Sequence, residues 1–265
     1  MDQAHYAITG VASGIGAALA ARLLARGCRV TGFDVRPPAE APFACHAVDL
    51  ADLASIETAM SQAAGPFDGL CNNAGVSPRA GQEAAILTIN YFAQRAVTRA
   101  VLPRLAPGAS IVNMASRAGA RWRENIAQVR RLAALDPTDP ADVAAFVRDE
   151  HLDAARAYNL SKEALIAWTL AEAEPMTARG GRINAVCPGA VSTGLLSDFA
   201  AAFGEAMARN VARAGRPGQP AEIAAIADFL LSPDSSWLRG AEISPDGGMG
   251  AFAASDALGL AALRL

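Results

Sequence analysis

Short apolar segments of high β-strand propensity alternate along the chain with alanine-rich stretches of helical length. The first helical stretch, AALAARLLAR at 17–26, ends at Gly27, a residue typical of helix termini. This alternation predicts an α/β fold, a single-domain Rossmann-type doubly wound parallel sheet with helices on both faces. The predicted strands end in or near Gly, Asn or Asp and cover 5–9, 28–34, 65–73, 109–116, 181–189 and 240–248.

Composition narrows the possible classes of protein. The 265 residues are 52% hydrophobic, enough to bury the core of one large domain. A net charge of −3 with scattered arginines argues against a nucleic-acid partner, and no apolar run approaches the roughly 18 residues of a membrane span. The four cysteines form no C-x-x-C pair and the first residues do not resemble a secretory signal, so we expect a cytoplasmic protein. The three histidines have no metal-ligand spacing, and no metal site is predicted.

A glycine-rich turn, TGVASGIG at 9–16, joins the first predicted strand to the first helix and contains Gly10, Gly14 and Gly16. Glycine at such a turn lets a pyrophosphate approach the backbone and the N–H groups that begin the helix. Glycine-rich turns also occur for packing alone, but the flanking strand and helix favour dinucleotide binding.

Asp34 ends the next strand, 18 residues after Gly16. A carboxylate at this place can accept hydrogen bonds from the adenosine ribose and would repel a 2′-phosphate, so NAD is favoured over NADP. Arg36 could instead pair with a phosphate, although we expect it to be a solvated loop residue.

Lys162 is the only lysine of the chain and follows Tyr158 by four residues, in YNLSK. On a helix the two side chains share one face, and an ammonium near the phenol would stabilise the phenolate and lower the pKa of the tyrosine. Such a pair can serve as an acid and base. Exposure of both residues on an ordinary amphipathic helix is the alternative.

With NNAG (72–75), Ser116, YNLSK (158–162) and PGAVST (188–193) in this order, the chain resembles the short-chain dehydrogenase/reductase family from about residue 5 to 250. The resemblance implies that Tyr158 is the general acid or base and that Lys162 lowers its pKa and binds the nicotinamide ribose. It also implies that Ser116 binds the substrate oxygen and that Asn90 holds a proton-relay water. The implied cofactor-binding residues are Gly10, Ser13, Gly14, Ile15, Gly16, Asp34, Asp49, Leu50, Asn73, Ala74, Gly75, Tyr158, Lys162, Pro188, Gly189, Val191 and Thr193.

Two segments depart from the usual family pattern. Ser116 and Tyr158 are 42 residues apart, which indicates an insertion at about 118–157. We expect it to form one or two helices beside the active-site entrance, one of them starting at Asp139-Pro140, or else a solvated excursion without a role. The C-terminal tail (249–265) is apolar, and packing into the core is the expected state, with docking at a neighbouring subunit as the alternative.

An insertion at this place resembles the bacterial 3α-hydroxysteroid dehydrogenase/carbonyl reductase group, whose relatives include enzymes of aryl alcohols such as coniferyl alcohol. The resemblance implies NAD-dependent hydride transfer to or from a small-molecule alcohol or ketone that is bulky and apolar, in a homodimer, with a tetramer as the alternative. A coniferyl-type aryl alcohol dehydrogenase and a non-catalytic nucleotide-binding regulatory module are the alternatives. The segment 196–207 fits either a lid over a hydrophobic substrate or a core helix.

Overall fold

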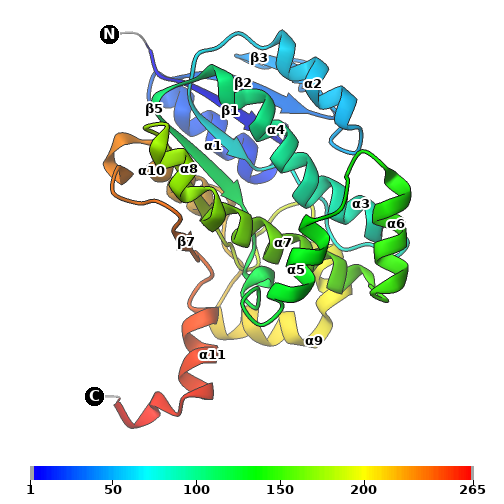
Figure 1. The fold of residues 1–265 in the computed structure, drawn as a ribbon. Helices are drawn as coiled ribbons and strands as arrows, with labels where there is room; N and C mark the ends of the chain where they lie inside the picture. The colour runs from blue at the N-terminus through cyan, green and yellow to red at the C-terminus, as the bar shows by residue number, and fades with distance from the viewer. Residues whose placement is uncertain (1–2, 264–265) are drawn as a thin grey trace.

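Seven parallel strands form one sheet in the order β3-β2-β1-β4-β5-β6-β7 in the computed structural model, which describes residues 3–263 (Figure 1). The predicted doubly wound parallel sheet is therefore confirmed. The short edge strand β3 was not predicted, because its sequence, ACHA, has neither an apolar run nor a clean alternation. The strands are β1 (His5–Thr9), β2 (Arg29–Asp34), β3 (Ala44–Ala47), β4 (Phe67–Asn72), β5 (Leu105–Met114), β6 (Arg182–Val186) and β7 (Glu242–Ile243).

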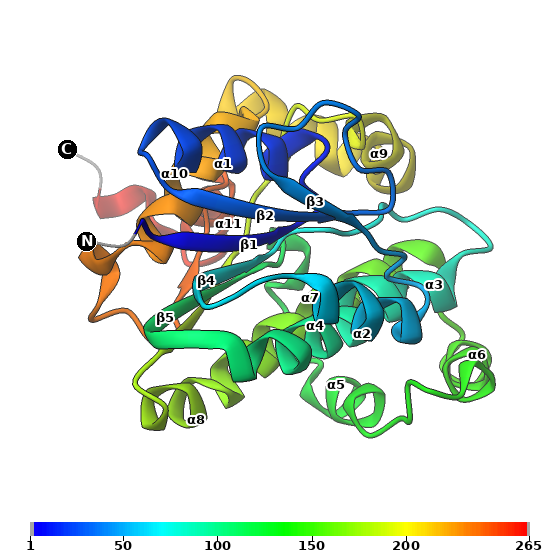
Figure 2. The same cartoon turned by 90° about the horizontal axis from the view of Figure 1, so that it is seen from above.

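Helices cover both faces of the sheet, as Figure 2 shows edge-on. One face packs against α1 (Gly14–Ala25) and α10 (Pro220–Leu231). The other packs against α2 (Leu53–Gln62), α4 (Ala93–Val101), α7 (Ala154–Ala171) and α8 (Ala173–Ala178). Successive side chains of a strand point to opposite faces of the sheet. Within β1, Tyr6 and Ile8 therefore pack on the side of α1 and α10, and Ala7 packs on the side of α2 and α4.

The direction of strand progression reverses between β1 and β4, which lie side by side at the centre of the sheet. Loops after β1 and β4 therefore leave toward opposite faces and open a crevice at the carboxyl ends of the strands. This topology fixes where a ligand can bind before any side chain is considered.

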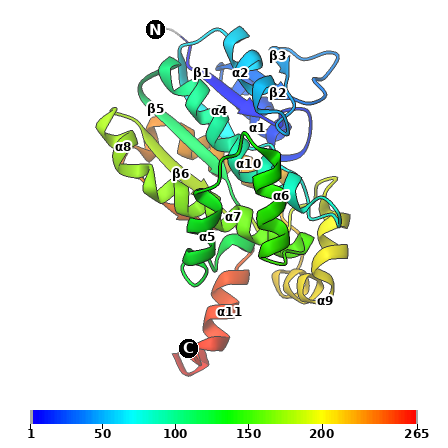
Figure 3. The ribbon, with the colours of Figure 1, turned by 45° about the vertical axis from the view of Figure 1, so that its right-hand side comes forward.

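The segment between Ser116 and Tyr158 contains two helices, α5 (Ile126–Ala133) and α6 (Pro140–Asp149). Asp139 caps α6, its carboxylate accepting a hydrogen bond from the Ala141 N–H at 2.8 Å. Of these helices, α5 packs against α7, and α6 packs against α3 (Glu83–Leu87) (Figure 3). Their apolar faces share one core with these helices through Val129, Leu132, Val143 and Phe146.

The C-terminal tail leaves the body of the protein as α11 (Met249–Ala257) and a 3₁₀ turn at Leu260–Leu263 (Figure 1). The expectation that it packs into the core is wrong, since Leu258 is 70% exposed. Gly247 and Gly248 both have positive φ and redirect the chain outward. Arg213 holds the tail by pairing with Asp256 at 2.6 Å. Residues 264–265 of the tail lie outside the described residues.

Among residues 3–263, no helix is long and apolar enough to cross a membrane. The same residues contain no group of three or more His, Cys, Asp or Glu side chains that could hold a metal ion.

Candidate active site

A pocket of about 820 Å³ lies at the carboxyl edge of the sheet. Its walls come from the loops after β1, β2, β4, β5 and β6, together with α7 and the helix α9 (Leu196–Ala214). Of the residues predicted from the sequence, Gly16 and Asn90 do not line it. The pocket is lined by the others: Gly10, Ser13, Gly14, Ile15, Asp34, Asp49, Leu50, Asn73, Ala74, Gly75, Ser116, Tyr158, Lys162, Pro188, Gly189, Val191 and Thr193.

The glycine loop is closed tightly against the loop after β4. A Cβ on Gly16 would lie 2.0 Å from the Gly10 carbonyl oxygen, so no other residue fits there. The side-chain amide of Asn73 donates to the carbonyl oxygens of Thr9 and Gly10, both at 3.1 Å, and fixes the path of the loop. Gly14 then begins α1 at the pocket wall, where free N–H groups and the helix dipole favour a pyrophosphate. This loop has the shape that a dinucleotide cofactor needs.

Asp34 lies at the end of β2 and lines the pocket. Its carboxylate accepts hydrogen bonds from the N–H groups of Ala12 at 2.9 Å and Arg36 at 3.0 Å. Each carboxylate oxygen keeps a second lone pair, so the group can still accept bonds from ribose hydroxyls. The Arg36 side chain is exposed and does not line the pocket.

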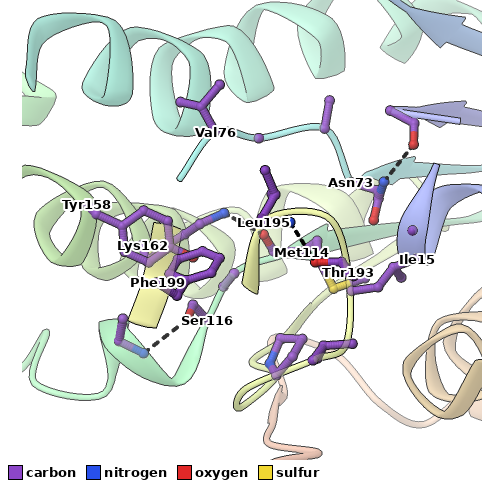
Figure 4. Close-up of a pocket in the computed structure, with 18 of the residues that line it drawn as sticks. Ile15, Asn73, Val76, Met114, Ser116, Tyr158, Lys162, Thr193, Leu195 and Phe199 are labelled. Atoms are coloured by element: carbon purple, nitrogen blue, oxygen red, sulfur yellow. Dashed lines mark hydrogen bonds between the residues drawn. The ribbon is translucent and has the colours of Figure 1, made fainter. Parts of the chain in front are cut away.

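Tyr158, Ser116 and Lys162 gather at the far end of the pocket (Figure 4). Helix α7 carries Tyr158 and Lys162 on one face, and Ser116 follows β5. Burial raises the pKa of Tyr158 to about 12, and a hydrogen bond with Ser116 opposes that rise. Burial lowers the pKa of Lys162 to about 8, and its Nζ donates to the Met114 carbonyl oxygen at 2.9 Å.

The expectation that Lys162 lowers the pKa of Tyr158 does not hold in this structure. The Lys162 Nζ lies 5.8 Å from the centre of the Tyr158 ring and is turned toward a backbone carbonyl. Desolvation of the phenol is the largest effect on its pKa and acts in the opposite direction. Tyr158 is therefore a protonated group at neutral pH, suited to donate a proton to a carbonyl oxygen.

Asn90 is fully buried in a π-helical turn (Thr88–Phe92) between α3 and α4. Its side chain accepts a hydrogen bond from the Val76 N–H at 2.8 Å and donates to the Val76 carbonyl at 3.0 Å. Gly75 lies between Asn90 and Lys162, because a Cβ there would meet both side chains. Asn90 thus holds the loop after β4 in place behind the lysine.

Helix α9 closes the pocket opposite Tyr158. None of its residues is buried, so of the two predicted readings of 196–207 the core helix is wrong. Phe199 lies edge-on to the Tyr158 ring at 5.1 Å between centroids, and Phe203 lies 6.3 Å away. Asp198 ties the helix to the loop after β4 by accepting bonds from Ser77 at 2.6 Å and Arg79 at 2.8 Å. The result is an aromatic cover over the tyrosine.

Comparisons with known proteins agree with this geometry. Residues 4–128 match the short chain dehydrogenase family, and residues 142–250 match a family described as enoyl-(acyl carrier protein) reductase. A coniferyl-alcohol dehydrogenase from a Pseudomonas species is 34% identical over 91% of this chain and 94% of its own length. The chain belongs to the short-chain dehydrogenase/reductase family.

Two further relatives carry a related activity in their names. A 3-alpha-hydroxysteroid dehydrogenase/carbonyl reductase from Comamonas testosteroni is 30% identical over 92% of this chain and 95% of its own length. A crystal structure of a 3-alpha-hydroxysteroid dehydrogenase from Pseudomonas sp., complexed with NADH, superposes with a TM-score of 0.82 at 32% identity, covering 94% of this chain and 98% of the other. This short-chain dehydrogenase is accordingly an alcohol/carbonyl oxidoreductase that uses a nicotinamide cofactor.

Asn159 lines the pocket although no sequence pattern singled it out, and its place directly after Tyr158 was a usable signal. Phe199 and Phe203 line the pocket from the segment 196–207, which the sequence offered as a lid. Phe199 and Phe203 are four residues apart and share a face of α9, a spacing that is visible in the sequence. Of the insertion, only Ala118, Ala120 and Arg121 line the pocket, and α5 and α6 do not. The insertion was expected beside the entrance of the active site, but only its first residues reach the pocket, because its helices cover α3 and α7.

Proposed function

We propose that this enzyme is an NAD-dependent dehydrogenase or carbonyl reductase for a secondary or aryl alcohol with a bulky apolar body. The observation that carries the proposal is the position of Tyr158, close to Ser116 and covered by the Phe199 ring, where the cofactor groove meets an apolar chamber. A reacting oxygen held by the two hydroxyls would leave the rest of the substrate against apolar side chains.

The glycine loop and Asp34 fit a bound NAD. They would hold its pyrophosphate and adenosine ribose, while Thr193 and Gly189 line the same pocket. When bound, the nicotinamide supplies or accepts the hydride exchanged with the carbinol carbon. Tyr158 moves the proton at the substrate oxygen, Ser116 orients that oxygen, and Lys162 keeps a positive charge beside the tyrosine.

Replacing Asp34 by serine tests the preference for NAD. The serine hydroxyl can still accept from the Ala12 N–H, but the negative charge that repels a 2′-phosphate is lost. We expect the ratio of kcat/KM with NAD to that with NADP to fall about 100-fold, from one or two lost charge-assisted hydrogen bonds. Initial rates with both cofactors measure this ratio.

Asp136→Ser is the matched control, because Asp136 is exposed and outside the pocket, and its ratio should equal that of the unmodified enzyme. An unchanged ratio in Asp34→Ser would mean that Asp34 does not select the cofactor.

Substrate class is tested by NADH formation over a panel of 3α-hydroxysteroids, coniferyl-type aryl alcohols, cyclic alcohols and short aliphatic alcohols. The aromatic cover by Phe199 and Phe203 and the similarity to a coniferyl-alcohol dehydrogenase favour aryl alcohols within the proposal. Preferred turnover of a steroid would favour the other branch of the same proposal. Preferred turnover of short aliphatic alcohols would contradict the bulky apolar substrate.

A further inference from the structure

Asn159 lines the pocket wall, and its side chain has no partner among the described residues. The Oδ1 atom of Asn159 is buried, and its amide makes no hydrogen bond with any other residue in the described range 3–263. Asn72 and Gln94 also have buried oxygens without a partner, but the NH₂ groups of both donate hydrogen bonds inside the core. The Asn159 side chain as a whole is only partly buried, so its unpaired amide can still bond a group outside the chain.

The charged neighbours of Asn159 on α7 do not supply that partner. Arg156 and Glu163 lie three residues before and four residues after it, on the same face of the helix. They form two hydrogen bonds with each other, at 2.9 and 2.7 Å. Their remaining contacts reach Gln128 and Asn125 of the insertion. Neither of these two side chains therefore bonds the Asn159 amide.

The other side chains around Tyr158 are mostly apolar or already paired. Asn210 of α9 also lines the pocket without a hydrogen bond to another described residue, but its side chain is exposed. Phe199 and Phe203 cover the tyrosine from α9. The guanidinium of Arg117 lies 3.5 Å from the Asp246 carboxylate, and that of Arg121 lies 2.7 Å from Glu124. A second polar atom on the substrate would therefore find in Asn159 a neutral partner with free bonding capacity, one residue from Tyr158.

We infer that Asn159 is a specificity-determining residue that hydrogen-bonds a second hydroxyl group of the substrate. The substrate would then be an alcohol or carbonyl compound whose apolar ring also carries a hydroxyl. A hydroxyl can both donate and accept, so it satisfies the amide in either orientation of its oxygen and nitrogen. The inference rests on the proposed function, because it concerns the same pocket.

The test compares benzyl alcohol with its ring-hydroxylated isomers in the unmodified enzyme and in Asn159→Leu, a replacement of similar size without polar atoms. The unmodified enzyme should prefer at least one hydroxylated isomer about 10-fold or more in kcat/KM, since a site built to bond a hydroxyl rejects the analogue that lacks it. In Asn159→Leu this preference should disappear. The rate with benzyl alcohol itself should stay within about 3-fold, because that substrate never used the amide.

Benzyl alcohol is the internal control, since damage to the fold or to Tyr158 would lower the rates of all the alcohols together. An equal loss for all of them, or a preference that survives in Asn159→Leu, would overturn the inference while the proposed function stands. If the unmodified enzyme turns over none of these alcohols and none of the wider panel, the proposed function is overturned, and the inference with it.

Discussion

Replacing Tyr158 by phenylalanine is expected to lower kcat for alcohol oxidation about 1,000-fold or more, the usual contribution of a positioned acid or base. The Tyr158 hydroxyl lies close to Ser116 and can carry the substrate proton. Its pKa of about 12 keeps it protonated and ready to donate in the reverse direction. The ring itself is retained, so the contact with Phe199 and the affinity for NAD should persist. Steady-state rates and NADH fluorescence titration measure the two effects separately.

Tyr6→Phe is the matched control. Tyr6 is also buried, at 3% exposure, but lies in β1 within the core and away from the pocket. Removal of the Tyr6 hydroxyl should leave kcat unchanged within about 2-fold. A Tyr158→Phe enzyme with an unaffected rate would remove Tyr158 from the chemistry.

Lys162→Met is expected to abolish most activity and yet to stabilise the folded protein. Activity should fall about 100-fold or more, because the ammonium that supports the proton transfer is gone. At pH 7 the free energy of unfolding should rise by about 2 kcal/mol, the cost of a buried charge less that of one lost hydrogen bond to Met114. Methionine fills the same unbranched volume without a charge.

The pH dependence of the stability gain follows from the pKa of Lys162, which burial lowers from its ordinary value of 10.5 to about 8. Below about pH 8 both folded and unfolded chains carry the charge, so the full penalty opposes folding. As the pH rises from about 8 to 10.5, the folded chain releases its proton first and the penalty disappears. Urea unfolding of both proteins at pH 7 and pH 10 should show the difference shrinking. A Lys162→Met protein that is less stable at pH 7 would contradict the assigned burial cost.

The cofactor half of the pocket could be predicted from the sequence, because local backbone geometry dictates it. Only glycine fits at position 16, because the turn closes onto Gly10, and Asp34 is placed by the end of a strand. Both can therefore be predicted from the residue type and its spacing in the sequence. Tyr158 and Lys162 can be predicted for the same reason, because they are four residues apart on one helix. The direction of the pKa change at Tyr158 could not be predicted from the sequence, because it depends on how the whole fold buries the phenol.

The substrate half depends on contacts between distant segments, which no local pattern encodes. Asp198 reaches Arg79 across 119 residues of sequence, and this contact sets the position of α9. The apolar content of the tail indicated burial, yet the two glycines at 247 and 248 direct it away from the body. The packing of α5 onto α7 and of α6 onto α3 could likewise be known only from the fold.

Isotope transfer tests the central claim most directly, using the panel alcohol of highest turnover with deuterium at the carbinol carbon. If this pocket transfers hydride between that carbon and the nicotinamide, the NADH formed by the purified enzyme will carry the deuterium on its nicotinamide ring, and Tyr158→Phe will form almost none. NADH without deuterium, or deuterium transfer that continues undiminished in Tyr158→Phe, would contradict the assignment of this site.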